Sequence, residues 1–186
     1  MKTKRMRSLM SACFLLCGIA SFASLPWIER RQIQSFLLDE PYYAPPVPMY
    51  ANRILIRNDD FGKGRFGATR GKNGKRKHLG LDLLTAVSNP ITASKSGRVS
   101  VAGIDRGYGW YVEIHHPDGK LSRYAHLTRI LVSQGDWVAV GQKIGLCGKS
   151  GNADEPRILP HLHFEIREGN LPLDPLSLFD PKLIAS

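Results

Sequence analysis

From residue 53 onward the chain consists of short apolar segments separated by turn-forming residues, and this pattern most restricts its fold. The clearest pair is 110–116 (WYVEIHH) and 120–127 (KLSRYAHL), separated by Pro-Asp-Gly at 117–119. Two strand-like segments joined by such a turn predict a β-hairpin. Further strands are predicted at 137–140, 144–147 and 161–167. Because no segment after residue 45 has a helical period, we predict an all-β domain with a mainly antiparallel sheet.

The segments before this domain differ from it in composition. Residues 28–40 carry apolar positions at near-helical spacing, which predicts a short N-terminal helix. Residues 41–48 read PYYAPPVP, and prolines both fix the backbone and end a helix, so this segment predicts a stiff extended linker. The expected organisation is therefore a helix and Pro-rich linker over residues 24–52, followed by a folded domain over residues 53–180.

The N-terminus has the pattern of an export signal. Four basic residues lie within the first seven, and the stretch from Leu9 to Ala23 carries no charge. Ser21-Phe22-Ala23 offers small residues where a signal peptidase would cut, which predicts a signal peptide over residues 1–23. If it is not cleaved, residues 8–28 are long enough to anchor the chain in a membrane. Both alternatives place the domain in the periplasm or cell envelope, whereas a buried N-terminal helix would not.

The charge of the chain favours an anionic partner. The 186 residues carry a formal charge of +10, which suits nucleic acid, lipid headgroups or an acidic cell-wall polymer. Export disfavours nucleic acid. Seven basic residues lie from Lys63 to Lys77, and five glycines lie from Gly62 to Gly74, which predicts a flexible basic loop. This loop is either a solvated face or a rim that attracts acidic substrate.

The motif His161-Leu162-His163 lies in a predicted strand, where residues two apart share a face. The two imidazoles should therefore lie side by side and could serve one metal centre, while the intervening apolar residues face the core. Glu165 lies on the same face, either as a support for the site or, as we expect, as an ordinary surface carboxylate.

A second pair of metal-binding side chains is formed by His78 and Asp82 in His-Leu-Gly-Leu-Asp. A straight strand would separate them by about 13 Å, too far for one ion. We therefore expect a loop that bends at Gly80 into a strand from Leu81, with Asp82 directed away from the core. Taken alone, the pair could equally be a loop histidine and a solvated carboxylate.

Together these pairs suggest a metal centre. His78, Asp82 and one histidine of the His-x-His motif supply three nitrogen or oxygen ligands, which with water make the open tetrahedral site of a catalytic zinc. The residues themselves offer either His161 or His163 as the third ligand. His126, in Tyr-Ala-His-Leu at 124–127, supplies a further imidazole with no evident role in the core.

Three motifs in this order, HLGLD at 78–82, YAHL at 124–127 and HLHFEI at 161–166, resemble the LytM/lysostaphin-type zinc metallopeptidases. The similarity runs from about residue 66 to residue 176 and includes the glycine-punctuated segment 135–145. It implies the antiparallel β-fold of that family, Zn²⁺ as cofactor, and zinc ligands at His78, Asp82 and His163. It also implies that His126 and His161 are the catalytic histidines.

The resemblance implies a zinc-dependent endopeptidase that hydrolyses peptide bonds in peptidoglycan stems or cross-links. His126 and His161 would orient and deprotonate the attacking water and stabilise the reacting groups. Two alternatives remain: a catalytically idle activator of a cell-wall amidase, and a carrier-like domain suggested by the hairpin at 135–145, which would leave the histidines unexplained. An insertion at Ala153–Pro160 departs from the family pattern and should lie at the mouth of the substrate groove.

Overall fold

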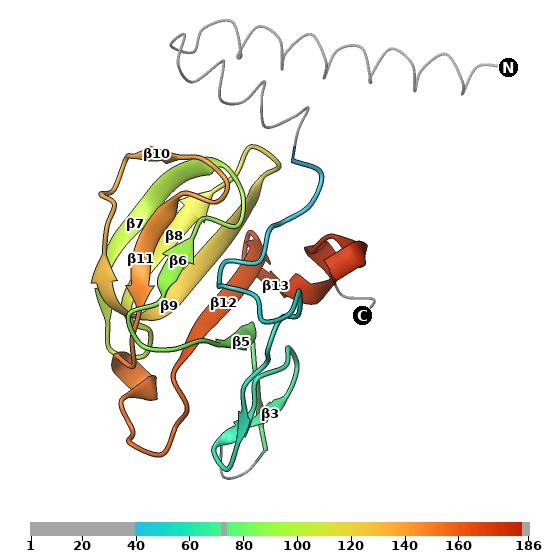
Figure 1. The fold of residues 1–186 in the computed structure, drawn as a ribbon, viewed down its shortest axis with the longest axis vertical. Helices are drawn as coiled ribbons and strands as arrows, with labels where there is room; N and C mark the ends of the chain where they lie inside the picture. Colours follow the sequence, from blue (N-terminus) through green and yellow to red (C-terminus); the bar gives the residue numbers. More distant parts are fainter. Residues whose placement is uncertain (1–39, 72–73, 184–186) are drawn as a thin grey trace, which may run out of the picture. The chain divides into compact units, whose positions relative to one another are not determined.

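The computed structural model describes residues 40–71 and 74–183 (Figure 1). The signal or anchor segment and most of the helix expected at 28–40 lie outside the described residues. Thirteen strands and three short 3₁₀ turns are present in the described ranges. The strands are β1 Asn58–Asp59, β2 Gly62–Lys63, β3 Thr69–Arg70, β4 Arg76–Lys77, β5 Leu81–Leu84, β6 Pro90–Thr92, β7 Gly97–Asp105, β8 Gly109–His115, β9 Lys120–Ile130, β10 Trp137–Val138, β11 Lys143–Cys147, β12 His161–Glu168 and β13 Leu171–Leu173. The 3₁₀ turns are η1 Gly151–Ala153, η2 Pro175–Leu178 and η3 Pro181–Leu183.

One antiparallel sheet forms most of the domain. Its main order is β10-β7-β8-β9-β11-β6, and β12 pairs with β9, β5 and β13. The hairpin expected at 110–127 is present as β8 and β9, with Glu113 opposite Arg123 and a left-handed Gly119 in the turn. Figure 1 shows β7, β8 and β9 as long neighbouring strands, with β12 running beside β9. The mainly antiparallel β-fold expected from the sequence is confirmed.

Strand β9 changes its partner at His126. Its first part, up to Ala125, pairs with β12, whereas Leu127 and the residues after it pair with β11. The register with β8 also shifts at this point, and His126 adopts a left-handed φ of 63°. A bulge of this kind changes the direction of a side chain. The strand can therefore present His126 to the site while its flanking residues Ala125 and Leu127 remain buried.

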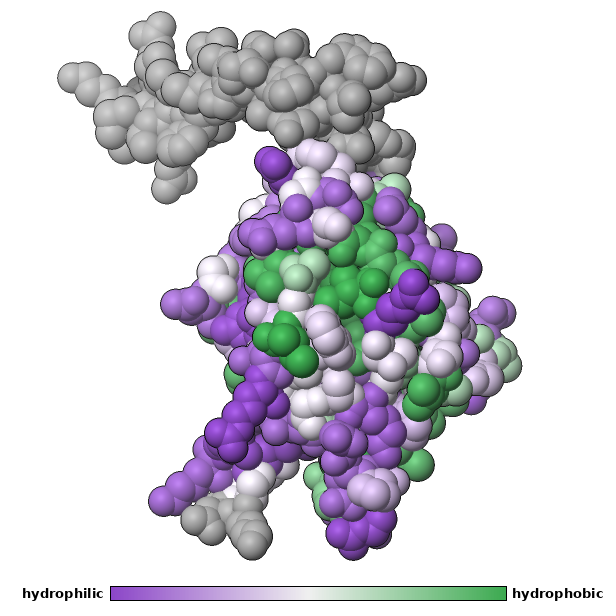
Figure 2. Space-filling view, turned by 90° about the vertical axis from the view of Figure 1, so that its left-hand side faces the viewer, coloured by the Kyte–Doolittle hydropathy of each residue, from purple (hydrophilic) through white to green (hydrophobic). Residues whose placement is uncertain are grey.

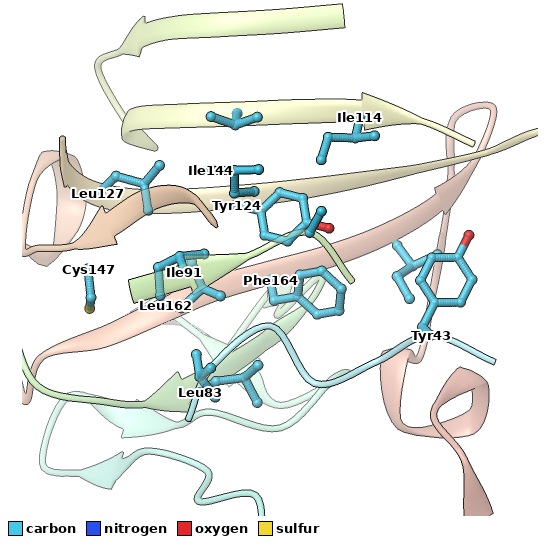
Figure 3. Close-up of a cluster of buried hydrophobic side chains, with 14 of the residues drawn as sticks. Tyr43, Leu83, Ile91, Ile114, Tyr124, Leu127, Ile144, Cys147, Leu162 and Phe164 are labelled. Carbon is cyan, nitrogen blue, oxygen red and sulfur yellow. The ribbon is translucent and has the colours of Figure 1, made fainter. Parts of the chain in front are cut away.

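The core lies among the strands of the sheet, and its side chains come from β5, β6, β8, β9, β11 and β12, with Tyr43 packed against them (Figure 3). Tyr43 lies in this core with 2% exposure, and Val47 joins the same cluster. The backbone of Tyr43 donates to Leu178, and Ala44 donates to Ser94. The interpretation of residues 41–48 as a linker is therefore wrong for this segment. Its backbone lacks a regular helix, as the prolines require, but its apolar side chains pack against the sheet.

The basic segment is more ordered than the sequence suggests. Strands β1 and β2 form one small hairpin, and β3 and β4 form another, so parts of the expected basic loop are hydrogen-bonded.

The surface of the domain is mixed, and Figure 2 shows a face on which a hydrophobic patch is surrounded by hydrophilic residues. Within residues 40–71 and 74–183, we find no helix with the length and apolarity needed to cross a membrane.

Candidate metal centre and active site

His78 and Asp82 are brought together by a bend before β5. The chain at Gly80 passes so close to β12 that a Cβ atom there would lie 2.3 Å from the carbonyl oxygen of Phe164. His78 Nε2 lies 2.9 Å from Asp82 Oδ1, which a straight strand could not achieve. The expectation of a bend between the two residues is confirmed.

Strand β12 separates polar from apolar side chains by simple alternation. His161, His163 and Glu165 line one pocket, whereas Leu162, Phe164 and Ile166 are fully buried in the core. In the sheet, His163 is opposite Asp82 of β5 on one side and Ala125 of β9 on the other. This register places the second His-x-His residue beside the carboxylate that follows the Gly80 bend.

Three ligand atoms converge at this point. His78 Nε2 and His163 Nδ1 are 3.0 Å apart, and each lies 2.9 Å from Asp82 Oδ1. All three side chains are buried, with exposures between 3% and 8%. Ligands about 2.0–2.1 Å from a tetrahedral zinc are roughly 3.3 Å apart, so this donor set has nearly the required spacing. No other group of three histidine, cysteine or acidic side chains in the described part of the chain converges in this way.

Hydrogen bonds at the outer edges of the rings determine which nitrogens remain free. His78 Nδ1 donates to the carbonyl oxygen of Arg65 at 2.9 Å, and His163 Nε2 donates to Glu165 Oε1 at 3.0 Å. These oxygens accept, so each ring can offer its inner nitrogen to a metal. Without a bound cation, the inner nitrogens share protons with the Asp82 carboxylate instead: burial would lower the pKa of His163, but hydrogen bonds with Asp82 and Glu165 raise it to about 9. The site therefore fits a metal ion.

Asp82 is held from its other side by two arginines. Arg57 Nη2 and Arg70 Nη2 each donate to Asp82 Oδ2 at 2.9 Å. Burial alone would raise the pKa of Asp82, but hydrogen bonds with His163 and His78 hold it well below its usual range. The carboxylate is therefore ionised at neutral pH. Sequence analysis missed both arginines, because one lies in the basic run and the other precedes it without a distinguishing motif.

Glu165 is a buried part of the site, and the expectation of a surface carboxylate is wrong. Only 1% of the residue is exposed. Its Oε1 accepts from the Tyr108 hydroxyl as well as from His163, and its Oε2 accepts from Arg123 and Arg167, each at 2.9 Å. Burial would raise the pKa of Glu165, but His163 and these arginines lower it to about 2. The alternation of polar and apolar residues along β12 correctly predicted the face on which Glu165 lies. It could not show that Tyr108 and Arg123 cover this side chain.

His126 and His161 face each other beside the three ligands. Their ring centroids are 5.1 Å apart, and the His126 ring lies 5.7 Å from that of His163. His126 Nδ1 donates to the carbonyl of Ser150 at 2.9 Å, and His161 Nδ1 donates to that of Leu159 at 2.7 Å. Both rings therefore keep an unprotonated Nε2. Burial lowers the pKa of His126 to about 3 and also lowers that of His161, so both are neutral bases at pH 7.

All five residues singled out from the sequence line one pocket of about 830 Å³. Its walls also include Arg76 and Lys77 from the basic segment, and Ala153 and Ile158 from the insertion. Part of the basic run is therefore a rim of the pocket and not only a solvated face. The insertion lies at the pocket, as expected from its position before the His-x-His motif.

The fold corresponds to that of a known group of peptidases. The model of peptidase family M23 matches residues 76–175, more than half of the chain, and the protein therefore belongs to this family. Among solved structures, the chain is similar to the catalytic domain of lysostaphin from Staphylococcus simulans, with 30% identity and a TM-score of 0.53. That match covers 64% of this chain and 90% of the lysostaphin domain.

Curated relatives include both a peptidase and an activator. The peptidoglycan DD-endopeptidase ShyB of Vibrio cholerae is 37% identical over 115 residues, covering 57% of this chain and 26% of ShyB. The murein hydrolase activator NlpD of Escherichia coli is 38% identical over 112 residues, covering 60% of this chain and 27% of NlpD. The chain thus spans about a quarter of the length of these two relatives. Both names refer to the cell wall, but the name of ShyB describes a peptidase and that of NlpD describes an activator of a hydrolase.

Proposed function

We propose that this protein is a zinc-dependent endopeptidase that hydrolyses peptide bonds in the stems or cross-links of peptidoglycan. The observation that carries the proposal is the orientation of four histidines. Each ring donates one N–H to a protein oxygen and directs its other nitrogen into the pocket that holds Asp82. A non-catalytic domain has no need for two further neutral imidazoles beside a three-ligand site.

In this proposal the residues divide into two groups. His78, Asp82 and His163 hold Zn²⁺, which when bound polarises the scissile carbonyl and makes water more acidic. His126 and His161 present unprotonated Nε2 atoms, so either ring can accept the proton of an attacking water and return it to the leaving amine. Arg57, Arg70 and Glu165 keep the ligands ionised and oriented.

The substrate assignment rests on charge and on the relatives. The pocket wall carries the exposed Arg76 and Lys77, which would attract a polymer with acidic peptide stems. ShyB acts on peptidoglycan according to its name, and it is 37% identical to this chain over 115 residues. Both points support a cell-wall peptide as the substrate of this chain.

Activity on a cell wall requires export, and we propose that the N-terminal segment provides it. Residues 1–23 would act as a cleaved signal, or residues 8–28 as a membrane anchor, which puts the domain in the periplasm or envelope. A fusion of alkaline phosphatase after residue 50 should be active. A fusion that becomes active only when another signal is added would refute export.

The alternative role as an activator of an amidase is favoured by the similarity to NlpD. One experiment separates the two functions. The purified full chain, loaded with zinc, is incubated with isolated peptidoglycan in the presence or absence of a cell-wall amidase. We expect peptide cleavage without the amidase, detected as new peptide termini by mass spectrometry, and its loss after chelation. Changes that appear only when the amidase is added would support the activator instead.

A further inference from the structure

The orientation of His161 depends on a residue just before it in the chain. His161 Nδ1 donates to the carbonyl oxygen of Leu159 at 2.7 Å. A carbonyl oxygen only accepts, so this bond selects the tautomer with the proton on Nδ1 and leaves Nε2 free. Whatever holds Leu159 in place therefore determines which nitrogen of His161 faces the pocket.

Leu159 is held by a residue that is distant in the sequence. Its backbone N–H donates to Asp59 Oδ2 at 3.1 Å, across a sequence separation of 100 residues. The Asp59 carboxylate is itself fixed, because its Oδ1 accepts from the guanidinium of Arg57 and from the backbone N–H of Phe61. Asp59 thus connects the first small hairpin of the domain to the insertion at 153–160.

The same arginine also contacts the metal-ligand group. Arg57 Nη2 donates to Asp82 Oδ2 at 2.9 Å. A continuous series of contacts therefore runs from Asp82 through Arg57 and Asp59 to Leu159 and His161. Its first part lies before residue 76, where the match to the family begins, and its last part includes the insertion.

We propose that Asp59 is a positioning residue for His161. It holds the N–H of Leu159, and the carbonyl of Leu159 in turn keeps the proton of His161 on Nδ1. Pro160 restricts the backbone of Leu159 to extended conformations but provides no partner for its N–H. The significance for catalysis rests on the proposed peptidase function, whereas the orientation of the ring does not.

The chemical consequence follows from the two tautomers of a neutral imidazole. If Leu159 is released, the proton can move to Nε2, and the ring then presents an N–H where a base is needed. The metal ligands His78, Asp82 and His163 do not contact Asp59. Loss of Asp59 should therefore lower kcat without removing zinc and with little change in KM.

The direct test is ¹⁵N NMR of the histidine rings in the zinc-loaded full chain, with His161 assigned by comparison with His161→Gln. We expect the Nδ1–H tautomer in the wild type. Asp59→Ala should shift His161 toward the Nε2–H form and lower kcat on peptidoglycan by about 10- to 100-fold. Asp59→Glu keeps two carboxylate oxygens that can accept from Leu159 and from Arg57, and should restore both. Asp60→Ala, which removes an adjacent exposed carboxylate, is the matched control and should behave as wild type.

Two results would overturn the proposal: a wild-type His161 protonated on Nε2, or an unchanged tautomer in a folded Asp59→Ala. If Asp59→Ala does not fold, an Nε2–H tautomer in a folded Asp59→Glu overturns it equally. If the tautomer shifts as expected but the wild-type protein cleaves no peptidoglycan, the positioning role stands and the proposed function fails.

Discussion

Nε2 of His163 donates a hydrogen bond to Glu165 Oε1 across 3.0 Å, two residues further along the same strand. Because residues two apart share a strand face, β12 supplies both a metal-binding imidazole and the carboxylate that orients it. The bond keeps the proton on Nε2 and turns Nδ1 toward Asp82. One short strand therefore supplies a metal ligand and fixes its orientation, and the neighbouring strand β5 supplies Asp82 opposite it.

This relationship gives a first prediction. Glu165→Gln should weaken zinc binding by about 10- to 100-fold, since the ring loses its anionic partner. Zinc affinity is measured by competition with a chelator of known strength. Glu168→Gln, at an exposed position on the same strand, is the control and should have little effect. Equal zinc affinities for the two variants would show that Glu165 does not orient the ligand.

A second prediction concerns the bend at Gly80. Gly80→Ala should destabilise the domain by about 1–3 kcal/mol, because the added methyl group meets the backbone of β12. It should also weaken zinc binding, since His78 and Asp82 would be displaced relative to each other. Gly103→Ala is a suitable control because the nearest atom to its new Cβ is 3.9 Å away. Urea unfolding compares the two, and equal stabilities would contradict the close approach.

A third prediction tests the packing of the segment before β1. Tyr43→Ala should cost about 3–5 kcal/mol of unfolding free energy, because a large buried ring is removed. Tyr42→Ala removes a ring from a neighbouring residue that is 47% exposed and should change stability by about 0.5 kcal/mol or less. If both variants are as stable as the wild type, residues 41–48 behave as the linker that their prolines suggest.

A fourth prediction is a pH dependence that originates far from the metal centre. Burial lowers the pKa of His116 from 6.5 to about 4, although its hydrogen bond to the carbonyl of Ser96 opposes this shift. The unfolded chain therefore binds a proton more readily between these values, and stability falls as the pH decreases from 6.5 to 4. The loss from this group amounts to about 3 kcal/mol and is complete below pH 4.

Urea unfolding at several pH values measures this contribution. His116→Gln should have a shallower decrease in stability over this window than the wild type. His115→Gln, at the exposed neighbouring position, should retain the full decrease. Identical slopes for the wild type and His116→Gln would contradict the prediction.

Local patterns predicted several of the strands, although not the long β7, and singled out the five residues that line the pocket. The alternation in β12 and the turn between β8 and β9 are properties of a few consecutive residues. The bend at Gly80 could be predicted because a straight strand would hold His78 and Asp82 too far apart to bind one ion. The position of His126 depends instead on a change of partner strand, which no local pattern reveals. Its imidazole could be noticed only because it had no role in the core.

The residues that the sequence did not reveal depend on long-range contacts. Glu165 is buried because Tyr108 and Arg123 from other strands cover it, and the alternation of β12 carries no information about them. Arg70 looks like a member of a solvated basic run, and Arg57 has no distinguishing motif, but in the structure both donate to Asp82. The Pro-rich segment lacks regular structure as expected, but its burial follows from the surface that the sheet offers to Tyr43.

The central claim divides the five residues of the pocket into metal ligands and catalysts. Its most direct test is zinc content by mass spectrometry, measured beside peptidoglycan digestion for His126→Ala, His161→Ala and His163→Ala. We expect the first two variants to keep about one zinc per chain and to lose about two to four orders of magnitude of activity. His163→Ala should lose its zinc. Full hydrolysis by both His126→Ala and His161→Ala, or loss of zinc in His161→Ala but not in His163→Ala, would contradict this assignment.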